Sequence, residues 1–254
     1  MPAAYDNYDY PAYWNGREYE HYSEFLAIKK LLQRIKKVSS TIEIGAGYGR
    51  LLPAYKFRSK KSLITDPSAK LISKARRKYS KSKNIYFAQS TLENLDIKKY
   101  KNKFDLLIMV RVLHHISDID NAFRIINKLL KDKGYLILEF PNKNHLKANI
   151  KQFLKGDFTY PLEIFPIDIR SKRHVKAKTL PFVNYHPDQI RSKIEEFGFE
   201  IIEMRSVSNV RSSFVKRFFP LSLLLDIESF LQVPFSKLYF GPSFFVLARK
   251  KSSI

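Results

Sequence analysis

Short apolar runs alternate with amphipathic segments over the first 141 residues of the chain. The run FDLLIMV at 104–110 is almost wholly apolar, as expected for a strand buried on both faces of a parallel sheet. At 118–131, apolar positions recur at helical spacing. The predicted strands are 42–44, 62–66, 84–88, 104–110 and 135–140, and the predicted helices are 19–37, 51–55, 67–79 and 118–131. This alternation predicts a doubly wound parallel sheet.

The alternation stops after Pro141 and resumes at Pro187. Residues 142–186 show no clean period, contain several prolines and include the basic stretch 170–178. After them we predict a helix at 187–197 and strands at 199–205 and 243–248, with an irregular Phe- and Leu-rich segment at 207–240. The sequence thus predicts an α/β fold with a mostly parallel, seven-stranded sheet and an inserted lid after the fifth strand. We divide it into an N-terminal lid and helix (1–40), a core (41–141 and 187–254) and an inserted cap (142–186).

The absence of cysteine limits the chemistry available to the chain. It rules out disulfides, thiolate zinc sites and cysteine nucleophiles, and we expect no metal site. The N-terminal residues do not resemble a secretory signal, and no apolar stretch approaches the roughly 18 residues of a membrane span. We therefore expect a cytoplasmic protein with no transmembrane segment.

The formal net charge of +22 raises the possibility of a nucleic-acid partner, because polyanions are bound mainly through Lys and Arg. The excess is spread over the chain and falls largely on predicted helix surfaces and turns. This distribution favours a solvated, lysine-rich surface over one specific polyanion site. A nucleic-acid partner stays open as the less favoured possibility, and the oligomeric state is not predicted.

The stretch TIEIGAGYGR, at 41–50, places three glycines directly after the first predicted strand. Gly45, Gly47 and Gly49 allow a tight turn in which a ligand approaches the main chain. Their spacing is G-x-G-x-G, whereas a dinucleotide-binding turn has G-x-G-x-x-G. Glu43, two residues earlier, argues against a phosphate at this turn and suits a ligand with cationic character. Asp66, at the end of the second strand, is placed to accept the hydroxyls of a ribose, a feature shared with NAD enzymes.

The ends of the next two strands complete the candidate site. Ser90 to Glu93 follow the third strand, and Arg111 to Ile116 follow the fourth. Because ligands of open parallel sheets bind at the carboxyl ends of the strands, these residues should meet near the glycine turn.

Together, these segments resemble the class I S-adenosylmethionine-dependent methyltransferases of types 11 and 12. The resemblance rests on IEIGAGYGR, LITDPS, the stretch from AQSTLENLD to VLHHISD, and GYLILEFPN. It implies S-adenosylmethionine as the cofactor and a Rossmann-like methyltransferase fold. It further implies a glycine loop against the amino-acid end of the cofactor, Asp66 on the ribose, and Thr91 and Leu92 beside the adenine.

YDYPAYWNGREYE resembles the family's leading lid, so Tyr13 and Arg17 would close over the cofactor, with Arg17 on its carboxylate. The predicted cofactor residues are Glu43, Gly45, Ala46, Gly47, Gly49, Asp66, Pro67, Thr91, Leu92, Arg111, Tyr13 and Arg17.

The acceptor side is less determined, because methyl transfer needs a base only when the acceptor must lose a proton. His114 and His115 are the candidate catalytic residues, and the sequence does not choose between them. Either histidine could instead cap the next helix or line the adenine pocket, and His186 is a weaker candidate. We predict O-methylation of a small-molecule acceptor, with an RNA methyltransferase, a non-catalytic cofactor-binding protein and an NAD oxidoreductase as alternatives.

For the acceptor pocket, we predict a roof from 142–186 and a second wall from 207–240. A basic rim is expected from Arg170, Lys172, Arg173 and Lys176, so the acceptor would be largely apolar and carry an acidic group.

Overall fold

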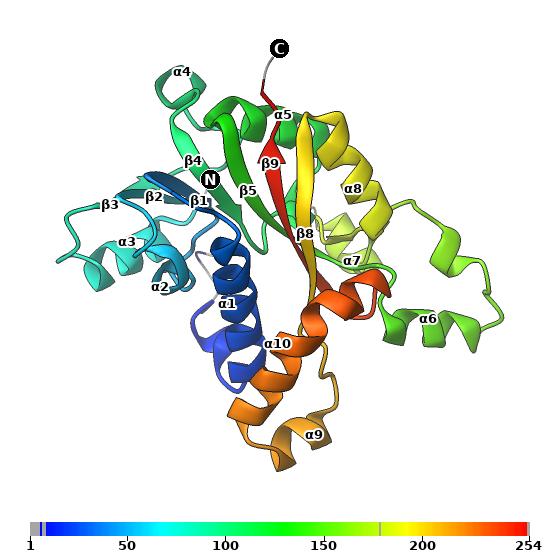
Figure 1. The fold of residues 1–254 in the computed structure, drawn as a ribbon. Coiled ribbons are helices and arrows are strands. Elements are labelled where there is room, and N and C mark those ends of the chain that lie inside the picture. Colours follow the sequence, from blue (N-terminus) through cyan, green and yellow to red (C-terminus); the bar gives the residue numbers. More distant parts are fainter. Residues whose placement is uncertain (1–5, 7–8, 178, 253–254) are drawn as a thin grey trace.

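A computed structural model describes residues 6, 9–177 and 179–252 (Figure 1). Its main sheet has the strand order β3-β2-β1-β4-β5-β9-β8. The strands are β1 (Ser40–Ile44), β2 (Lys61–Asp66), β3 (Ile85–Gln89), β4 (Phe104–Met109), β5 (Leu130–Pro141), β8 (Phe199–Val207) and β9 (Ser243–Lys250). The first five strands pair in parallel, and β9 runs antiparallel between β5 and β8. The predicted doubly wound, mostly parallel seven-stranded sheet is confirmed.

Helices cover both faces of this sheet, and each face has its own apolar core. In β4, Leu106 and Ile108 belong to one core and Leu107 and Met109 to the other, as the two-residue period of a strand requires. One face packs against α1 (Glu18–Gln33), α2 (Leu52–Tyr55) and α3 (Ala69–Lys78), and the other against α5 (Ile119–Leu129) and α8 (Pro187–Glu196). The fifth strand begins at Leu130, earlier than the predicted start at residue 135, so α5 ends at Leu129, two residues before the predicted end.

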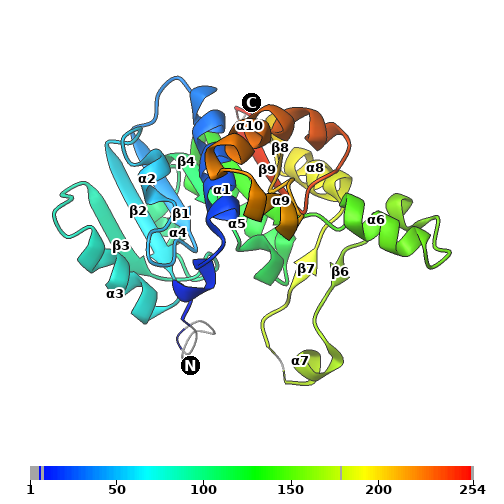
Figure 2. The ribbon, with the colours of Figure 1, turned by 90° about the horizontal axis from the view of Figure 1, so that it is seen from below.

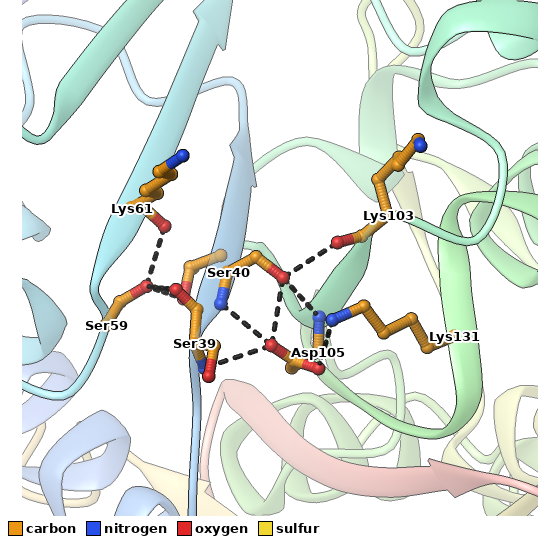
Figure 3. Close-up of polar contacts among 8 residues, drawn as sticks. Ser39, Ser40, Ser59, Lys61, Lys103, Asp105 and Lys131 are labelled. Carbon is orange, nitrogen blue, oxygen red and sulfur yellow. Dashed lines mark hydrogen bonds and ion pairs between the residues drawn. The ribbon is translucent and has the colours of Figure 1, made fainter.

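A polar cluster fixes the start of β1 against β4 at the edge of the sheet opposite the glycine loop (Figure 3). The Asp105 carboxylate accepts the backbone N–H groups of Ser39 and Ser40 at 3.0 and 2.8 Å. Lys131 donates to its other oxygen at 2.7 Å. This cluster joins the amino-terminal ends of β1, β4 and β5. It thereby fixes the register of these strands, and the same register aligns their carboxyl ends at the opposite edge of the sheet.

The inserted segment leaves the carboxyl end of β5 and projects from the sheet (Figure 2). It contains α6 (Leu146–Phe153), η3 (Tyr160–Leu162), β6 (Ile167–Asp168), α7 (Lys172–Lys176) and β7 (Val183–Asn184). β6 and β7 pair as a two-stranded arm with α7 near its tip. At its base, the buried Lys143 ammonium donates to the carbonyls of Glu163 and Phe165.

The segment 207–240, predicted to be irregular, instead forms α9 (Ser213–Phe218) and α10 (Leu221–Lys237). The prediction was wrong because the face that α10 buries is mainly polar. Leu224, Glu228, Gln232 and Ser236 recur every four residues and are all buried. The Glu228 carboxylate accepts the Tyr19 hydroxyl of α1 at 2.5 Å and the Ser208 N–H at 2.8 Å. A helix held by such contacts has no apolar stripe for a sequence pattern to reveal.

Candidate active site

A cavity of about 760 Å³ opens at the carboxyl edge of the sheet. Its volume lies within the roughly 300–1,000 Å³ typical of small-molecule sites. The predicted residues that line it are Tyr13, Gly45, Gly47, Asp66, Pro67, Thr91, Leu92, Arg111, His114 and His115. The inserted segment contributes Leu180 and Phe182. The structure thus brings together the strand ends predicted to converge, from four strands and two distant segments.

The glycine loop keeps its main chain bare on the cavity side. Gly45 has a φ of +69°, and a Cβ there would clash with Val112 Cγ2. Gly47, at φ +56°, lines the cavity opposite the Tyr10 ring. A side chain is therefore disfavoured at both positions by the backbone conformation, and at Gly45 also by packing.

Two predicted cofactor residues of this loop lie outside the cavity lining. The Ala46 N–H donates to the Thr65 carbonyl at 2.8 Å, which ties the loop to β2. Gly49 packs under Tyr79, whose hydroxyl donates to the Gly49 carbonyl at 2.8 Å. In this structure they shape the loop and do not face the cavity.

Asp66 joins the end of β2 to the glycine loop. Its Oδ2 accepts the Gly47 N–H at 2.8 Å, and its Oδ1 accepts the Ser68 N–H at 2.9 Å. Burial raises the pKa of this carboxyl, and the two N–H donors work against that rise. Each oxygen can accept a further hydrogen bond, so the carboxylate is held in place to receive a pair of hydroxyls.

We expect Asp66→Ala to weaken binding of S-adenosylhomocysteine by about 1.5–3 kcal/mol, roughly tenfold to a hundredfold, because hydrogen bonds to a charged group are lost. Isothermal titration calorimetry of the folded variant measures this effect. Asp118→Ala is the matched control, since Asp118 accepts the Asn121 N–H at the start of α5 and lies outside the cavity lining. Unchanged affinity for Asp66→Ala would contradict the assignment.

Glu43 was predicted to meet the cofactor as an anion, but it lies beneath the loop and does not line the cavity. Its Oε2 accepts the Tyr55 hydroxyl, and the side chain is buried. Burial raises the pKa of Glu43 to about 7, against the opposing effects of the Tyr55 hydrogen bond and the Arg50 charge. The Glu43 carboxyl is therefore only partly ionised at neutral pH. Its position beneath the glycine loop is that of a residue that supports the loop.

The raised pKa of Glu43 predicts a pH-dependent stability. The folded protein keeps a proton that the unfolded chain releases, so stability falls as pH rises from about 4.5 to about 7. Glu43→Gln retains an acceptor for Tyr55 and has no proton to lose. We expect the variant to be more stable than the unaltered protein by about 1–3 kcal/mol at pH 8 and nearly equal to it at pH 5. Urea unfolding at the two pH values measures the difference in stability. If Glu43→Gln changed the stability equally at both pH values, the raised pKa of Glu43 would be contradicted.

The N-terminal lid is held beside the cavity by a buried ion-pair cluster. The sequence analysis did not predict this cluster. Glu24 of α1 accepts Arg50 Nη2 at 2.5 Å and Arg111 Nη2 at 2.6 Å, one on each carboxylate oxygen. The Trp14 ring packs on both guanidinium groups, 3.7 Å from Arg50 and 4.7 Å from Arg111. Burial opposes ionisation of Glu24, but the charges of Arg111 and Arg50 hold its pKa below the usual value.

Arg111 occupies a strained position at the end of β4. Its φ is +59°, uncommon for a non-glycine residue, and its N–H donates to the buried Glu139 carboxylate at 2.7 Å. Such strain often marks functional sites, and Arg111 lines the cavity as predicted. Arg17, by contrast, is exposed above the Tyr13 ring at 4.3 Å and does not line the cavity. The predicted contact of Arg17 with the cofactor has no counterpart in this arrangement.

The two histidines after β4 differ in their surroundings. His115 Nδ1 lies 2.7 Å from the Pro181 carbonyl, which can only accept, so this nitrogen carries the proton. Burial lowers the pKa of His115 below its usual value, and the bond to Pro181 partly offsets this. His115 is thus a neutral imidazole at pH 7 with the lone pair on Nε2.

His114 is more deeply buried, and burial, followed by the neighbouring His115 and Arg111, lowers its pKa well below the usual value. Its Nδ1 has no hydrogen-bond partner among the described residues, and its ring lies 4.4 Å from that of Phe182. Neither histidine caps α5, because Asp118 does so. His186 caps α8 by accepting the Asp188 N–H and lies outside the cavity lining.

The cavity fits S-adenosylmethionine in its chemistry. The Asp66 carboxylate suits a ribose diol, the bare main chain at Gly45 and Gly47 allows close approach, and Leu92 and Ile116 provide apolar wall for a base. Within the described residues, no group of three or more His, Cys, Asp and Glu side chains could hold a metal ion.

Comparison with known proteins decides the family. A model of the methyltransferase domain matches residues 14–204. The chain belongs to the methyltransferase-domain family. The resemblance to class I S-adenosylmethionine-dependent methyltransferases is confirmed, and S-adenosylmethionine is the cofactor.

Individual relatives of this methyltransferase are distant. It is 30% identical over 151 residues to a highly reducing polyketide synthase of Gibberella fujikuroi, covering 54% of this chain and 6% of the synthase. It is 28% identical over 164 residues to a ubiquinone biosynthesis O-methyltransferase of Pelagibacter ubique, covering 64% of this chain and 66% of that protein. The chain therefore spans less than two thirds of either relative. A solved S-adenosylmethionine dependent methyltransferase from Mesorhizobium loti shares the fold at 15% identity and a TM-score of 0.60, covering 90% of this chain and 98% of that one.

Proposed function

We propose that this protein transfers a methyl group from S-adenosylmethionine to an oxygen atom of a small, largely apolar molecule, with His115 as the general base. The observation that carries the proposal is the bond from His115 Nδ1 to the Pro181 carbonyl. It fixes the tautomer that leaves Nε2 able to accept a proton, in a cavity at the expected cofactor position.

The residues on the acceptor side position and desolvate the reacting oxygen. When bound, the cofactor supplies a methyl group on a positively charged sulfur, so transfer needs an aligned nucleophile and little else. Leu180, Phe182 and Ile116 supply apolar wall beside the histidines and exclude water from that side. His115 Nε2 takes the hydroxyl proton as the oxygen attacks, and its lowered pKa keeps it unprotonated at pH 7.

A small acceptor suits the cavity better than a polynucleotide. The basic residues expected at its rim, Arg170, Lys172, Arg173 and Lys176, are absent from the lining, and the Arg170 side chain is paired with Asp168. The segment 207–240 likewise contributes no described residue to the lining. These findings remove the reason for requiring an acidic group on the acceptor. The name of the Pelagibacter ubique relative, an O-methyltransferase, agrees with oxygen as the accepting atom.

Incubating the protein with methyl-labelled S-adenosylmethionine and a cell extract tests the proposal. We expect label in the fraction soluble in organic solvent, bound to oxygen by mass spectrometry. Label in the RNA fraction, with binding that falls steeply as salt increases, would overturn the small-molecule assignment. Absence of label in any fraction, with S-adenosylhomocysteine still bound, would favour a non-catalytic cofactor-binding protein.

A further inference from the structure

The inserted segment carries an amphipathic helix whose apolar face is uncovered. Leu146, Ile150, Phe153 and Leu154 recur at the spacing that places side chains on one face of a helix. Their side chains are exposed by 43% to 80%, and α6 buries none of its residues. A helix of this kind inside a folded protein normally turns its apolar face to the core. Here the residues of that face are exposed to solvent. α6 lies at the periphery of the molecule (Figure 1).

The apolar surface continues beyond the end of α6. Phe158 packs edge-on against Phe153 with the ring centroids 4.9 Å apart, and Phe158, Leu162 and Phe165 are all exposed. Exposed apolar side chains that gather in one segment mark a docking site more often than single exposed ones do. We name the exposed apolar residues of 146–165 together the α6 surface.

A row of lysines runs along the α6 surface. Lys147 and Lys151 are spaced by four residues, so they align on α6 beside the apolar face, and Lys155 follows in the turn after the helix. All three are exposed. The nearby acids are already engaged: Asp157 accepts the Tyr160 N–H at 3.0 Å, and Glu163 lies 3.5 Å from the Lys143 ammonium. The surface therefore combines apolar side chains with an aligned positive edge.

We infer that the α6 surface docks the protein onto the interface of an anionic lipid bilayer. Apolar side chains on one face of a helix with lysines beside them are the pattern of helices that lie in a membrane interface. Each lysine near an anionic surface adds attraction, and the net charge of +22 draws the whole protein toward it. No helix among the described residues has the length and apolar character to cross a bilayer.

Other occupants fit this surface less well. A second copy would bring its own lysine row and a charge of +22 against the same features, and lysine is depleted from protein interfaces. A polynucleotide would meet the lysines and could stack bases on Phe153 and Phe158. The aliphatic residues Leu146, Ile150 and Leu154, which form most of the apolar face of the helix, offer it neither hydrogen bonds nor base stacking.

The position of the α6 surface also suits an apolar acceptor. α6 follows the carboxyl end of β5, and α9 follows that of β8, so both leave the sheet at the edge where the cavity opens. α9 exposes Phe214 and Phe218 next to Lys216 and Arg217 and lies toward the same end of the molecule (Figure 1). Docking would bring the cavity mouth to the bilayer. The inference goes beyond the proposed function and does not depend on which atom is methylated.

Vesicle sedimentation of the full chain tests the inference. The probes are vesicles of phosphatidylcholine alone and of phosphatidylcholine with one quarter phosphatidylglycerol, at 0.15 M salt. We expect binding to the anionic vesicles and at least about tenfold less to the neutral ones. Phe153→Asp with Leu154→Asp should lower the partition about a hundredfold. Replacing Lys147, Lys151 and Lys155 by Gln should lower it at least about tenfold.

Matched controls lie elsewhere on the surface. Phe57→Asp changes an aromatic residue that is more exposed than Phe153, and Gln at Lys98, Lys99 and Lys101 removes the same charge near α4 (Ile97–Tyr100). All variants must keep the thermal midpoint and the affinity for S-adenosylhomocysteine, which shows that they are folded. The inference is overturned if the unaltered protein does not bind anionic vesicles, or if the control variants lose as much binding as the α6 variants. It is also overturned if the unaltered protein binds no vesicles but forms a dimer that, by light scattering, dissociates on the Phe153 and Leu154 changes.

Discussion

Replacement of Glu24 by alanine is expected to destabilise the protein by about 3–5 kcal/mol, because it leaves the buried Arg50 and the partly buried Arg111 without their shared anion. Glu24 is only 1% exposed and accepts Arg50 and Arg111 on its two carboxylate oxygens. With the carboxylate gone, the two guanidinium groups would repel each other beside Trp14. Urea unfolding at pH 7 measures the loss.

A second carboxylate of the same helix provides the control for this prediction. Glu20 of α1 pairs with Lys216 at 2.6 Å near the surface, so Glu20→Ala removes an equal charge at a cost of about 0–1 kcal/mol. The depressed pKa of Glu24 adds a pH signature: its contribution is complete above about pH 4.5 and is lost as pH falls through the folded-state pKa. Similar losses for the two variants would show that the buried cluster contributes no more than a surface pair.

The buried strands of the sheet and the glycine turn could be predicted because their signals are local. A strand buried on both faces is a short apolar run, as in β4, and a turn that needs positive φ selects glycine, as at Gly45. α10 has no such signal, since its buried positions are filled by Glu228 and Gln232. The Glu24 cluster was missed for a related reason: Glu24 lies in α1, Arg50 and Arg111 lie in the loops after β1 and β4, and only their tertiary arrangement makes them partners.

The choice between the histidines illustrates the same limit at the level of chemistry. His114 and His115 are adjacent in sequence and equivalent in composition, so no pattern distinguishes them. The group that distinguishes them, the Pro181 carbonyl, lies 66 residues further along the chain, in the inserted segment. Prediction of a base therefore required the fold, whereas prediction of the acid at Asp66 required only its place at a strand end.

His115→Gln is expected to lower kcat by about 10²–10⁴-fold, the usual contribution of a positioned general base. The amide can still donate to the Pro181 carbonyl, so the local structure and the affinity for S-adenosylhomocysteine should change little. In the unaltered enzyme, activity should fall as pH drops through the lowered pKa of His115, because only the neutral imidazole accepts a proton. The variant should lose this acidic limb together with the rate.

His114→Gln separates this role from simple packing. His114 is buried and lies beside Phe182, with its ring centroid 4.0 Å from that of His115, so its replacement disturbs the same wall without removing the oriented nitrogen. We expect a smaller loss of kcat in this variant and an acidic limb that persists. If the acidic limb instead disappears with His114→Gln and persists with His115→Gln, then His114 is the base and the Pro181 bond serves only to anchor the inserted segment. If both variants keep the limb and most of the rate, the acceptor needs no base, and the proposal of a hydroxyl acceptor fails with it.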